Sequence, residues 1–533
     1  MRGPARVTQP VLECTRHPVP QRWTPTLVDA LVAPHDQVTM DVRIAVGLIR
    51  FSLDWDLEAT RIALAARGIE LSLACLSNLS DEFLIRWNLF LEDTRPAWAP
   101  RLKRGFVLMI DATHVNGGPA TVRAVDARTG VTILSQCIPS ENEDDLVVFL
   151  QDVKRLVGKP RRILRDGGSA IKAACARVFP NVAQQLCHFH YLREAGKALL
   201  TGSYDALKKA VVETKELPAL QRIADALAHT VPHESGVRRA LGVFARLLIE
   251  HVVSARDSVG GFPFRLAYHE AAARVRDARA WAAKAVTSAM RLNVHHPLLV
   301  EARQRLDALG QDADVRPAFL RVERLWSWFL EVRDLMRLER GFNDGNEPPV
   351  LTPSDRDAVL KRVHEIRGEA ARAGPAESAA WEGLVERFRE HEHELWVFLD
   401  AKGVPRTTNQ IEGYHRDDRR GIRKRTGQGA TNAGMERVGE YLALWSNARN
   451  PWFVKRVLSG VDLAKAFLSQ DRARVAAGLA ALRAKRWRGR LPVRAQDRKG
   501  LLEEFVRLMD SGSEAAGLDA WAARVEGVAA TGV

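Results

Sequence analysis

Two aspartates placed at the ends of predicted strands are the residues of this sequence best suited to chemistry. Asp111 ends the apolar run FVLMID, residues 106–111, and Asp166 follows the run RRIL, residues 161–164, just before two glycines. If the two strands are neighbours, both carboxylates lie at one edge of a sheet, where a hard cation such as Mg²⁺ finds the oxygen ligands that it prefers. Each aspartate alone is also explained as a turn or helix N-cap residue.

A third carboxylate, Glu412, lies in the segment TTNQIEGYHR, where we predict a helix that opens near Thr407. At about 100° per residue, one stripe of this helix joins Glu412 to three arginines: Arg416, Arg419 and Arg423. This layout suits a carboxylate that reaches a metal ion while guanidinium groups follow a phosphate backbone. The alternative is a solvated helix with local ion pairs, such as Glu412 with Arg416. Other acidic residues are better explained by a predicted helix start: Glu141, Glu143, Asp144 and Asp145.

The stretch QLCHFHYLRE places Cys187, His188 and His190 within four positions. A structural zinc site normally needs four ligands, and no second Cys/His pair with ligand spacing lies nearby, which disfavours zinc. The plainer alternative is a buried cysteine with a hydrogen-bonded core histidine.

Charge and composition narrow the class of protein. The 533-residue chain has a formal net charge of +14, which favours a polyanionic partner such as nucleic acid, although mildly basic proteins are common. Its five cysteines are scattered and odd in number, so we expect a reducing compartment rather than a disulfide framework. The N-terminus lacks the apolar run of a signal peptide, and no apolar stretch approaches the roughly 18 residues of a membrane span.

The N-terminal hundred residues read as an arm followed by helices. After the proline-containing residues 1–34, helical periodicity predicts a helix over 56–67 that ends at Gly68, and then a short helix over 72–78. Helix, glycine turn and short helix is the order of a helix-turn-helix, although any αα-hairpin has the same pattern.

Strand patterns are confined to the next segment. Strands are predicted over 106–111, 120–125 and 131–134 as an antiparallel meander, then a helix with a Ser140–Glu143 capping box, a strand over 161–164, a helix over 169–178 and a strand over 182–186. The predicted order is therefore βββαβαβ.

The rest of the chain is helical in pattern, with no convincing strand over 191–402. Core packing explains Trp326 and Trp328 of this region more simply than stacking on an unpaired base. Residues 483–498 form a basic stretch that either binds a phosphate backbone or is a solvated helix face. The predicted organisation is an arm (1–34), a helix-turn-helix domain (35–100), two parts of a catalytic core (101–190 and 403–450) around a helical insertion (191–402), and a basic helical C-terminal region (451–533).

The ordered set IDATHV, LRDGGSAIKAA, QLCHFHYLRE and TTNQIEGYHRDDRRGIRKR resembles the DDE transposases of bacterial insertion sequences, and more narrowly their Mutator-like group. The resemblance covers about residues 105–447, and the insertion is matched only by length and helicity. It implies an α+β fold: an RNase H-like α/β core, interrupted by an all-helical insertion and preceded by a helix-turn-helix domain.

The resemblance also implies the site. Asp111, Asp166 and Glu412 would hold two Mg²⁺ ions, with Mn²⁺ as a substitute, for nicking at the element's ends and transfer of the exposed 3′-hydroxyl to target DNA. Cys187 and His190 would belong to the wall of the catalytic site. We expect the basic residues of the glutamate helix to bind DNA: Arg416, Arg419, Arg420, Arg423, Lys424 and Arg425.

Expected partners are double-stranded DNA, as terminal inverted repeats and target, and a second or further protomer, with no membrane. The expected location is the bacterial cytoplasm, at the nucleoid. Two other functions stay open: an RNase H-like structure-specific nuclease that cuts but does not join, and a non-catalytic DNA-binding protein derived from a transposase.

Overall fold

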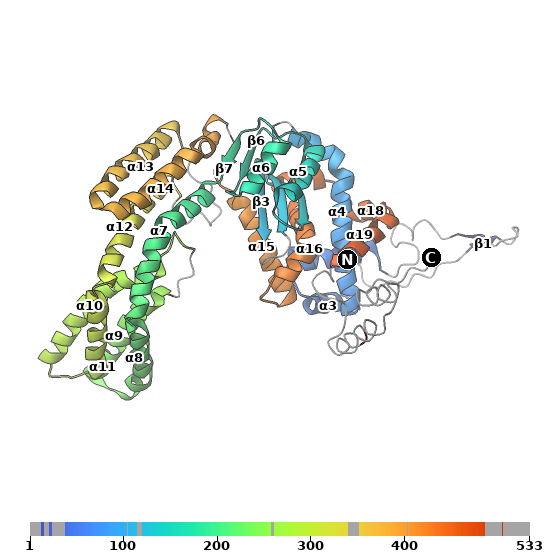
Figure 1. Ribbon diagram of the computed structural model, residues 1–533. Helices are drawn as coiled ribbons and strands as arrows, with labels where there is room; N and C mark the ends of the chain where they lie inside the picture. Colours follow the sequence, from blue (N-terminus) through green and yellow to red (C-terminus); the bar gives the residue numbers. More distant parts are fainter. Residues whose placement is uncertain are drawn as a thin grey trace. The chain divides into compact units, whose positions relative to one another are not determined.

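The computed structural model describes residues 12–14, 21–23, 38–103, 105–114, 120–256, 261–338, 351–401, 403–485 and 504. Contacts divide the chain into two compact units, residues 1–184 with 408–533 and residues 185–407. We call the first the sheet unit and the second the helical unit (Figure 1). The chain is therefore a mixed α and β protein, as predicted, and the predicted insertion, 191–402, falls inside the helical unit.

The sheet unit contains the strands and the flanking helices. Its elements in chain order are β1 (Leu12–Cys14), β2 (Gln21–Trp23), α2 (Met40–Ser52), α3 (Leu57–Ala65), α4 (Leu73–Lys103), β3 (Val107–His114), β4 (Ala120–Asp126), β5 (Val131–Ile138), α5 (Glu143–Val157), β6 (Arg162–Arg165), α6 (Ser169–Val178), the start of β7 (Gln184–Leu186), α15 (Asn409–Thr426), α16 (Asn432–Trp445), α17 (Pro451–Phe453), α18 (Leu463–Leu468) and α19 (Arg472–Lys485). Short 3₁₀ and π segments follow α16 and α17 at Ser446–Arg449 and Val454–Leu458.

The central sheet confirms the predicted βββαβαβ order. Its strands lie side by side in the order β5-β4-β3-β6-β7, with β3 antiparallel to β4, β4 antiparallel to β5, and β3 parallel to β6. One prediction is wrong: Asp111 does not end its strand. Strand β3 continues to His114 because β4 pairs with it as far as Ala120. Asp111 therefore lies inside a paired strand, where its backbone is held on the β4 side.

The two faces of the sheet differ in chemistry. Alternate residues of β3 and β4, such as Leu108, Ile110 and Val122, join a large core cluster with Phe149 and Leu150 of α5. Because successive side chains point to opposite faces of a strand, the residues between them project to the other face. These residues are mainly polar: Asp111, Thr113, Thr121 and Arg123. This second surface, the polar face, is the one that α15 contacts.

Helix α5 begins differently from the prediction. The predicted capping box of Ser140 and Glu143 is not formed; the N-cap residue is Asn142, whose side chain accepts a hydrogen bond from the Asp145 N–H over 2.9 Å. The Ser140 N–H instead donates to Asp145. Asparagine at the N-cap satisfies a free backbone donor as well as serine does, and the helix therefore starts two residues later.

The predicted short helix over 72–78 is also wrong. Helix α4 runs for 31 residues and continues through Pro96 and Pro100. Its first turns pack with α2 and α3 in a small cluster of Val46, Leu64, Leu76 and Leu79, and its later residues join the core of the sheet unit. The apolar side chains beyond residue 78 are buried against that core, which stabilises the helix far past the expected end.

Helix α2 crosses α4 so closely at Gly47 that a Cβ atom there would lie 2.0 Å from Cγ of Phe83. We expect Gly47→Ala to lower the free energy of unfolding by about 3 kcal/mol, because the two helices must separate to admit the methyl group. The matched control is Gly202→Ala in the helical unit, where a Cβ atom meets nothing within 4 Å. That change should stabilise by up to about 1 kcal/mol. Urea denaturation of both variants measures the difference, and a Gly47→Ala protein as stable as wild type would contradict the close crossing.

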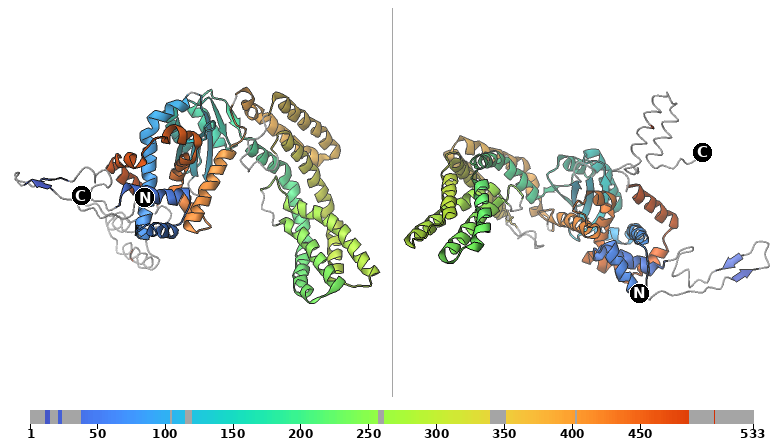
Figure 2. Two further views of the ribbon diagram at one scale, coloured as in Figure 1. Left: turned by 180° about the vertical axis from the view of Figure 1, so that it is seen from behind. Right: turned by 90° about the horizontal axis from the view of Figure 1, so that it is seen from below.

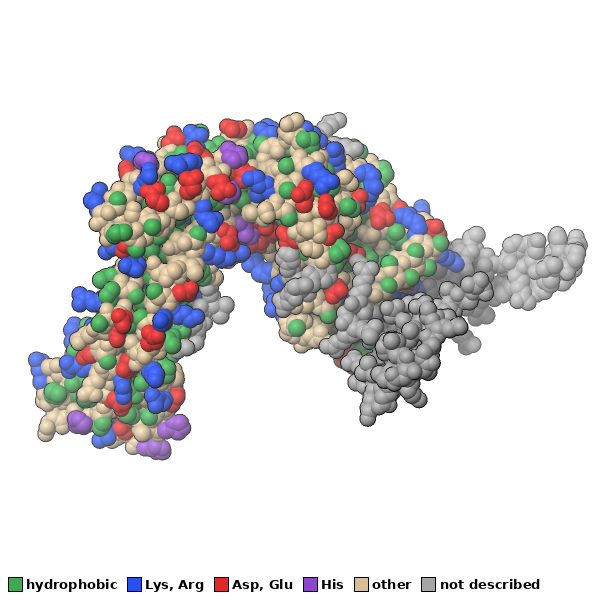
Figure 3. Space-filling view, in the orientation of Figure 1, with side chains coloured by type: hydrophobic (Ala, Val, Ile, Leu, Met, Phe, Trp, Pro, Cys, Tyr) green, Lys and Arg blue, Asp and Glu red, His purple; other side chains and the backbone are tan. Residues whose placement is uncertain are grey.

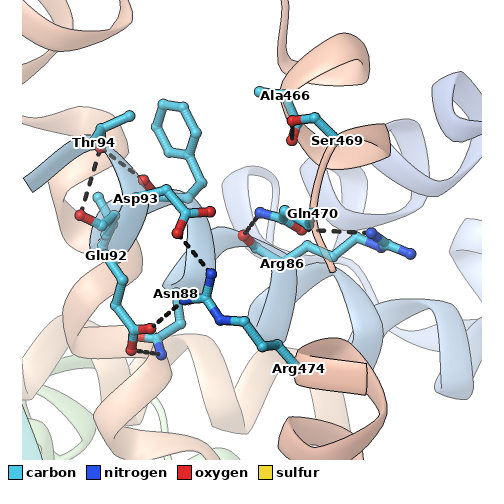
Figure 4. Close-up of polar contacts among 11 residues, drawn as sticks. Arg86, Asn88, Glu92, Asp93, Thr94, Ala466, Ser469, Gln470 and Arg474 are labelled. Atoms are coloured by element: carbon cyan, nitrogen blue, oxygen red, sulfur yellow. Dashed lines mark hydrogen bonds and ion pairs between the residues drawn. The ribbon is translucent and has the colours of Figure 1, made fainter. Parts of the chain in front are cut away.

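The last described helices are fastened to α4 by polar contacts (Figure 4). Buried Arg86 of α4 donates to the Phe467 carbonyl over 2.8 Å, and Gln470 donates back to the Arg86 carbonyl over 2.8 Å. One turn further along, Arg474 pairs with Glu92 and Asp93 at the surface. Helix α19 ends at Lys485, so most of the predicted basic stretch 483–498 lies outside the described residues.

The helical unit begins at the end of β7 and consists of helices joined by short turns (Figure 2). They are α7 (His188–Glu213), α8 (Glu216–Thr230), α9 (Gly236–Val253), α10 (Ala267–Arg291), α11 (Pro297–Gln311), α12 (Val315–Leu335), α13 (Pro353–Ala373) and α14 (Pro375–Leu395), with 3₁₀ turns at Val231–His233, Ser254–Arg256 and Val397–Asp400. Within the described part of 191–402 there is no strand, as predicted.

The tryptophans of α12 make contacts inside the helical unit. Trp328 is 6% exposed and its indole N–H donates to Glu369, while the indole N–H of half-buried Trp326 donates to the Pro263 carbonyl. Both contacts support core packing over base stacking. Acidic and basic side chains are interspersed over the drawn face of this unit (Figure 3), in keeping with its many local ion pairs. Among the helices that the structure describes, none is long and apolar enough to cross a bilayer.

Candidate active site

Asp111 and Asp166 are brought level with each other by the pairing of β3 with β6. In this parallel pair, Ile110 is the register partner of Arg165, so each aspartate is the next residue along its strand. Asp111 is 6% exposed, and Asp166 opens the turn that leads into α6. The predicted meeting of the two carboxylates at neighbouring strands thus has the required backbone geometry.

The backbone around Asp166 is fixed from both sides. The Asp166 carboxylate accepts the Gly168 N–H over 3.0 Å, as a turn residue does. The preceding Arg165, 1% exposed, donates to the Asp166 carbonyl over 2.7 Å and to Gln184 over 2.6 Å. The turn role and a ligand role are compatible, because one carboxylate oxygen accepts the turn hydrogen bond and the other keeps its lone pairs.

Glu141 is an acidic residue of this site that the sequence analysis assigned to a helix start. Helix α5 begins only at Glu143, and Glu141 lies in the loop before it. A Cβ atom on Gly168 would lie 3.2 Å from Oδ1 of Asp166 and 3.5 Å from Oε1 of Glu141, so both carboxylates border the same small space. Proximity to Asp166 arises from the β5–α5 loop, which no local sequence pattern reveals.

Helix α15 lies against β3 on the polar face. Arg419 of α15 donates from Nη2 to the Thr113 hydroxyl over 2.7 Å, and Thr113 is two residues beyond Asp111 on the same face. Glu412 lies in the first turn of α15 and is half-buried. The element carrying the third predicted carboxylate is therefore packed against the strand carrying the first.

The six basic residues predicted to bind DNA separate into two groups. Four are exposed and, within the part of the chain that the structure describes, make no ion pair: Arg416, Arg420, Arg423 and Lys424. The predicted alternative, a Glu412–Arg416 pair, is therefore not formed. The other two point inward, because Arg419 donates to Thr113 and Arg425 pairs with Asp54 beside the ring of Phe51. Burial lowers the pKa of Arg425, although the attraction of Asp54 opposes this.

Cys187 and His190 belong to the helical unit, and their surroundings are described there. Cys187 is buried and precedes α7, while His190 is half-buried with its ring centre 6.0 Å from that of Phe189. The hydrogen-bonded core histidine of this motif is His188, whose ring nitrogen Nε2 lies 2.7 Å from the Leu395 carbonyl. His188 is flanked edge-on by Trp396 and Phe398.

Burial, reinforced by the charge of Arg406, lowers the pKa of His188 to about 3. Since the unfolded chain takes up a proton near pH 6.5 and the folded chain does not, stability is full above pH 6.5 and falls with pH towards 3. We expect His188 to account for about 2 kcal/mol of lost unfolding free energy between pH 7 and pH 5. In urea denaturation at the two pH values, His188→Phe should remove that loss. The exposed His229→Phe is the control, and an unchanged pH dependence in His188→Phe would refute the assignment.

The donor set of the sheet unit fits a hard divalent cation. Asp111, Asp166 and Glu412 offer only carboxylate oxygens, which Mg²⁺ prefers, from two level strand positions and a helix packed on one of them. As the side chains stand, no three acidic, histidine or cysteine residues among those described are gathered closely enough to hold a metal ion. Metal binding would therefore draw the carboxylates inward from these backbone positions.

Comparisons with known proteins identify no relative. No protein-family model and no curated protein matches this chain. The assignment of function consequently depends on the resemblance of the sequence motifs and on the geometry of the sheet unit.

Proposed function

We propose that this chain is a DDE transposase, which nicks DNA at the ends of an insertion sequence and transfers the exposed strand to target DNA. The observation that carries the proposal is the level placement of Asp111 and Asp166 on neighbouring parallel strands, with the helix of Glu412 packed against β3. A sheet whose first long strand, β3, lies between β4 and β6 fits the RNase H-like core that the motifs imply.

Asp111, Asp166 and Glu412 would hold two Mg²⁺ ions, and Mn²⁺ would substitute. Bound there, the ions would stabilise the attacking and leaving oxygens of a phosphodiester. The protein's own contribution is positioning: β3 and the β6–α6 turn fix two carboxylates in register, and the buried side of α15 fixes the third. The four exposed basic residues of α15 would neutralise the DNA backbone beside the site.

DNA-end recognition is proposed for the N-terminal helices. Helix α3 and the first turns of α4 enclose a turn at Gly68, and Arg61 and Arg67 of this region are exposed. Such a helix pair can enter a major groove, as in a helix-turn-helix. We further propose that the helical unit braces DNA ends in a homodimer or higher oligomer at the bacterial nucleoid.

The test is a nicking and joining assay on a supercoiled plasmid that carries the element's own ends, with Mg²⁺ or Mn²⁺. Wild type is compared with Glu412→Gln, and DNA binding is measured for each. Metal-dependent nicking and joining that Glu412→Gln loses, with binding retained, would support the proposal. Nicking without joining would favour the structure-specific nuclease, and binding without metal-dependent cleavage would leave a non-catalytic DNA-binding protein.

A further inference from the structure

A buried ion pair joins β4 to the helix that carries Glu412. Arg123 of β4 is 0% exposed, and its Nη2 donates to Oδ2 of Asp418 on α15 over 2.6 Å. The Arg123 guanidinium carbon also lies 5.1 Å from the centre of the Tyr414 ring. Asp418 and Tyr414 are one helical turn apart, so two successive turns of α15 hold the same arginine.

Arg123 is also the cross-strand partner of Asp111. The two residues are directly opposite each other in the β3–β4 pair, so their side chains project to the same face. Burial lowers the pKa of the Arg123 guanidinium, and the negative charges of Asp418 and Asp111 oppose that shift. The arginine therefore stands between the first predicted carboxylate and the helix of the third.

The remaining inward side chains of α15 leave little freedom for the helix to shift. Arg419 is bonded to Thr113 of β3, and the ring of His415 is 6% exposed between these contacts. Burial, and then the charges of Arg123 and Arg419, keep the pKa of His415 well below its usual value, so the ring is neutral. A displacement of α15 would separate the buried charges of Arg123 and Asp418, which is strongly unfavourable.

We propose that the Arg123–Asp418 pair is the positioning device of the carboxylate site: it fixes α15 on the polar face and thereby sets the reach of Glu412 towards Asp111. This inference rests on the proposed function, because it gives the pair a role in that site. Asp418 lies six residues after Glu412 on one continuous helix, so a change at Asp418 is transmitted to Glu412 as a movement of α15. Arg123 and Asp418 are positioning residues in this account, not ligands.

The test uses the full-length protein without DNA and two readouts that do not depend on strand cleavage. Hydrogen–deuterium exchange reports the protection of backbone amides in residues 409–426, and electron paramagnetic resonance titration reports Mn²⁺ affinity. Asp418→Asn should speed exchange in α15 by about tenfold or more and weaken Mn²⁺ binding by about tenfold. The control is Asp417→Asn, the exposed neighbour, which should change both by less than about twofold. Arg123→Lys keeps the charge and should restore part of the Mn²⁺ affinity that Arg123→Met loses.

The outcomes separate this inference from the proposed function. Unchanged exchange in α15 of Asp418→Asn overturns the inference. Faster exchange with unchanged Mn²⁺ affinity also overturns it, because the pair would then only stabilise the helix. Loss of Mn²⁺ affinity in Asp418→Asn supports it even if the wild type never joins DNA strands, a result that would count against the transposase alone.

Discussion

Asp166→Asn should reduce metal-dependent nicking by at least about 10³-fold, equivalent to about 4 kcal/mol of transition-state stabilisation. Asparagine has nearly the same shape, and its side-chain oxygen can still accept the Gly168 N–H, which Asp166 now accepts over 3.0 Å. The turn into α6 should therefore survive, and the change removes only the negative charge. Asp111→Asn should have a similar effect, because its position is level with Asp166 on the adjacent strand.

The control for these variants is Asp144→Asn, which removes an acid at the start of α5 whose side chain is 89% exposed. It should nick DNA as the wild type does. Single-turnover nicking of a labelled plasmid measures all three variants, with thermal unfolding and DNA binding as checks on the fold. A folded, DNA-binding Asp166→Asn protein that nicks at the wild-type rate would exclude Asp166 from the site.

Replacing the four exposed basic residues of α15 by glutamine should weaken DNA binding about 10³-fold at 0.1 M salt. The replaced residues are Arg416, Arg420, Arg423 and Lys424. If each contacts one phosphate, the plot of log affinity against log salt becomes shallower by about 3.6, since each released counterion contributes about 0.9. Fluorescence anisotropy with a duplex at several salt concentrations measures both quantities.

The control is Arg472→Gln on α19, an exposed arginine of the same unit that makes no ion pair among the described residues. It should change the salt slope by less than about one unit, because a single distant charge releases at most one counterion. A quadruple variant with an unchanged slope would show that this face of α15 does not meet DNA. Arg419 and Arg425 are left intact, because both make internal contacts and their removal would disturb the fold.

The strands and the helices between them were predictable because their signals are local. Alternating apolar residues and glycine turns determine β3, β4 and β5, and helix α6 occupies the predicted residues 169–178. The pairing of β3 with β6 then follows from general rules of strand connection, and with it the level placement of Asp111 and Asp166. The length of α4 was not predictable in this way, because its later turns are stabilised by core residues far away in the sequence.

The supporting residues of the site were hidden for the same reason. Arg123 and Asp418 are 295 positions apart, and neither lies in a distinctive motif. Glu141 shares the features of any acidic helix-start residue until the fold places it beside Gly168 and Asp166. The inward orientation of Arg425 likewise depends on Asp54 of the N-terminal helices. Charge and spacing identify an ionic helix face, whereas only the packing decides which of its charges stay exposed.

The most direct test of the central claim is the metal preference of Asp166→Cys in the nicking assay. If Asp166 holds a metal ion, a thiolate in its place should disfavour the hard Mg²⁺ relative to the softer Mn²⁺. We expect the ratio of the Mn²⁺ rate to the Mg²⁺ rate to rise by at least about 10²-fold over the wild-type ratio, about 2.7 kcal/mol of differential stabilisation. Mg²⁺-dependent nicking at the wild-type rate, with an unchanged metal preference, would show that Asp166 touches no catalytic metal and would contradict the account.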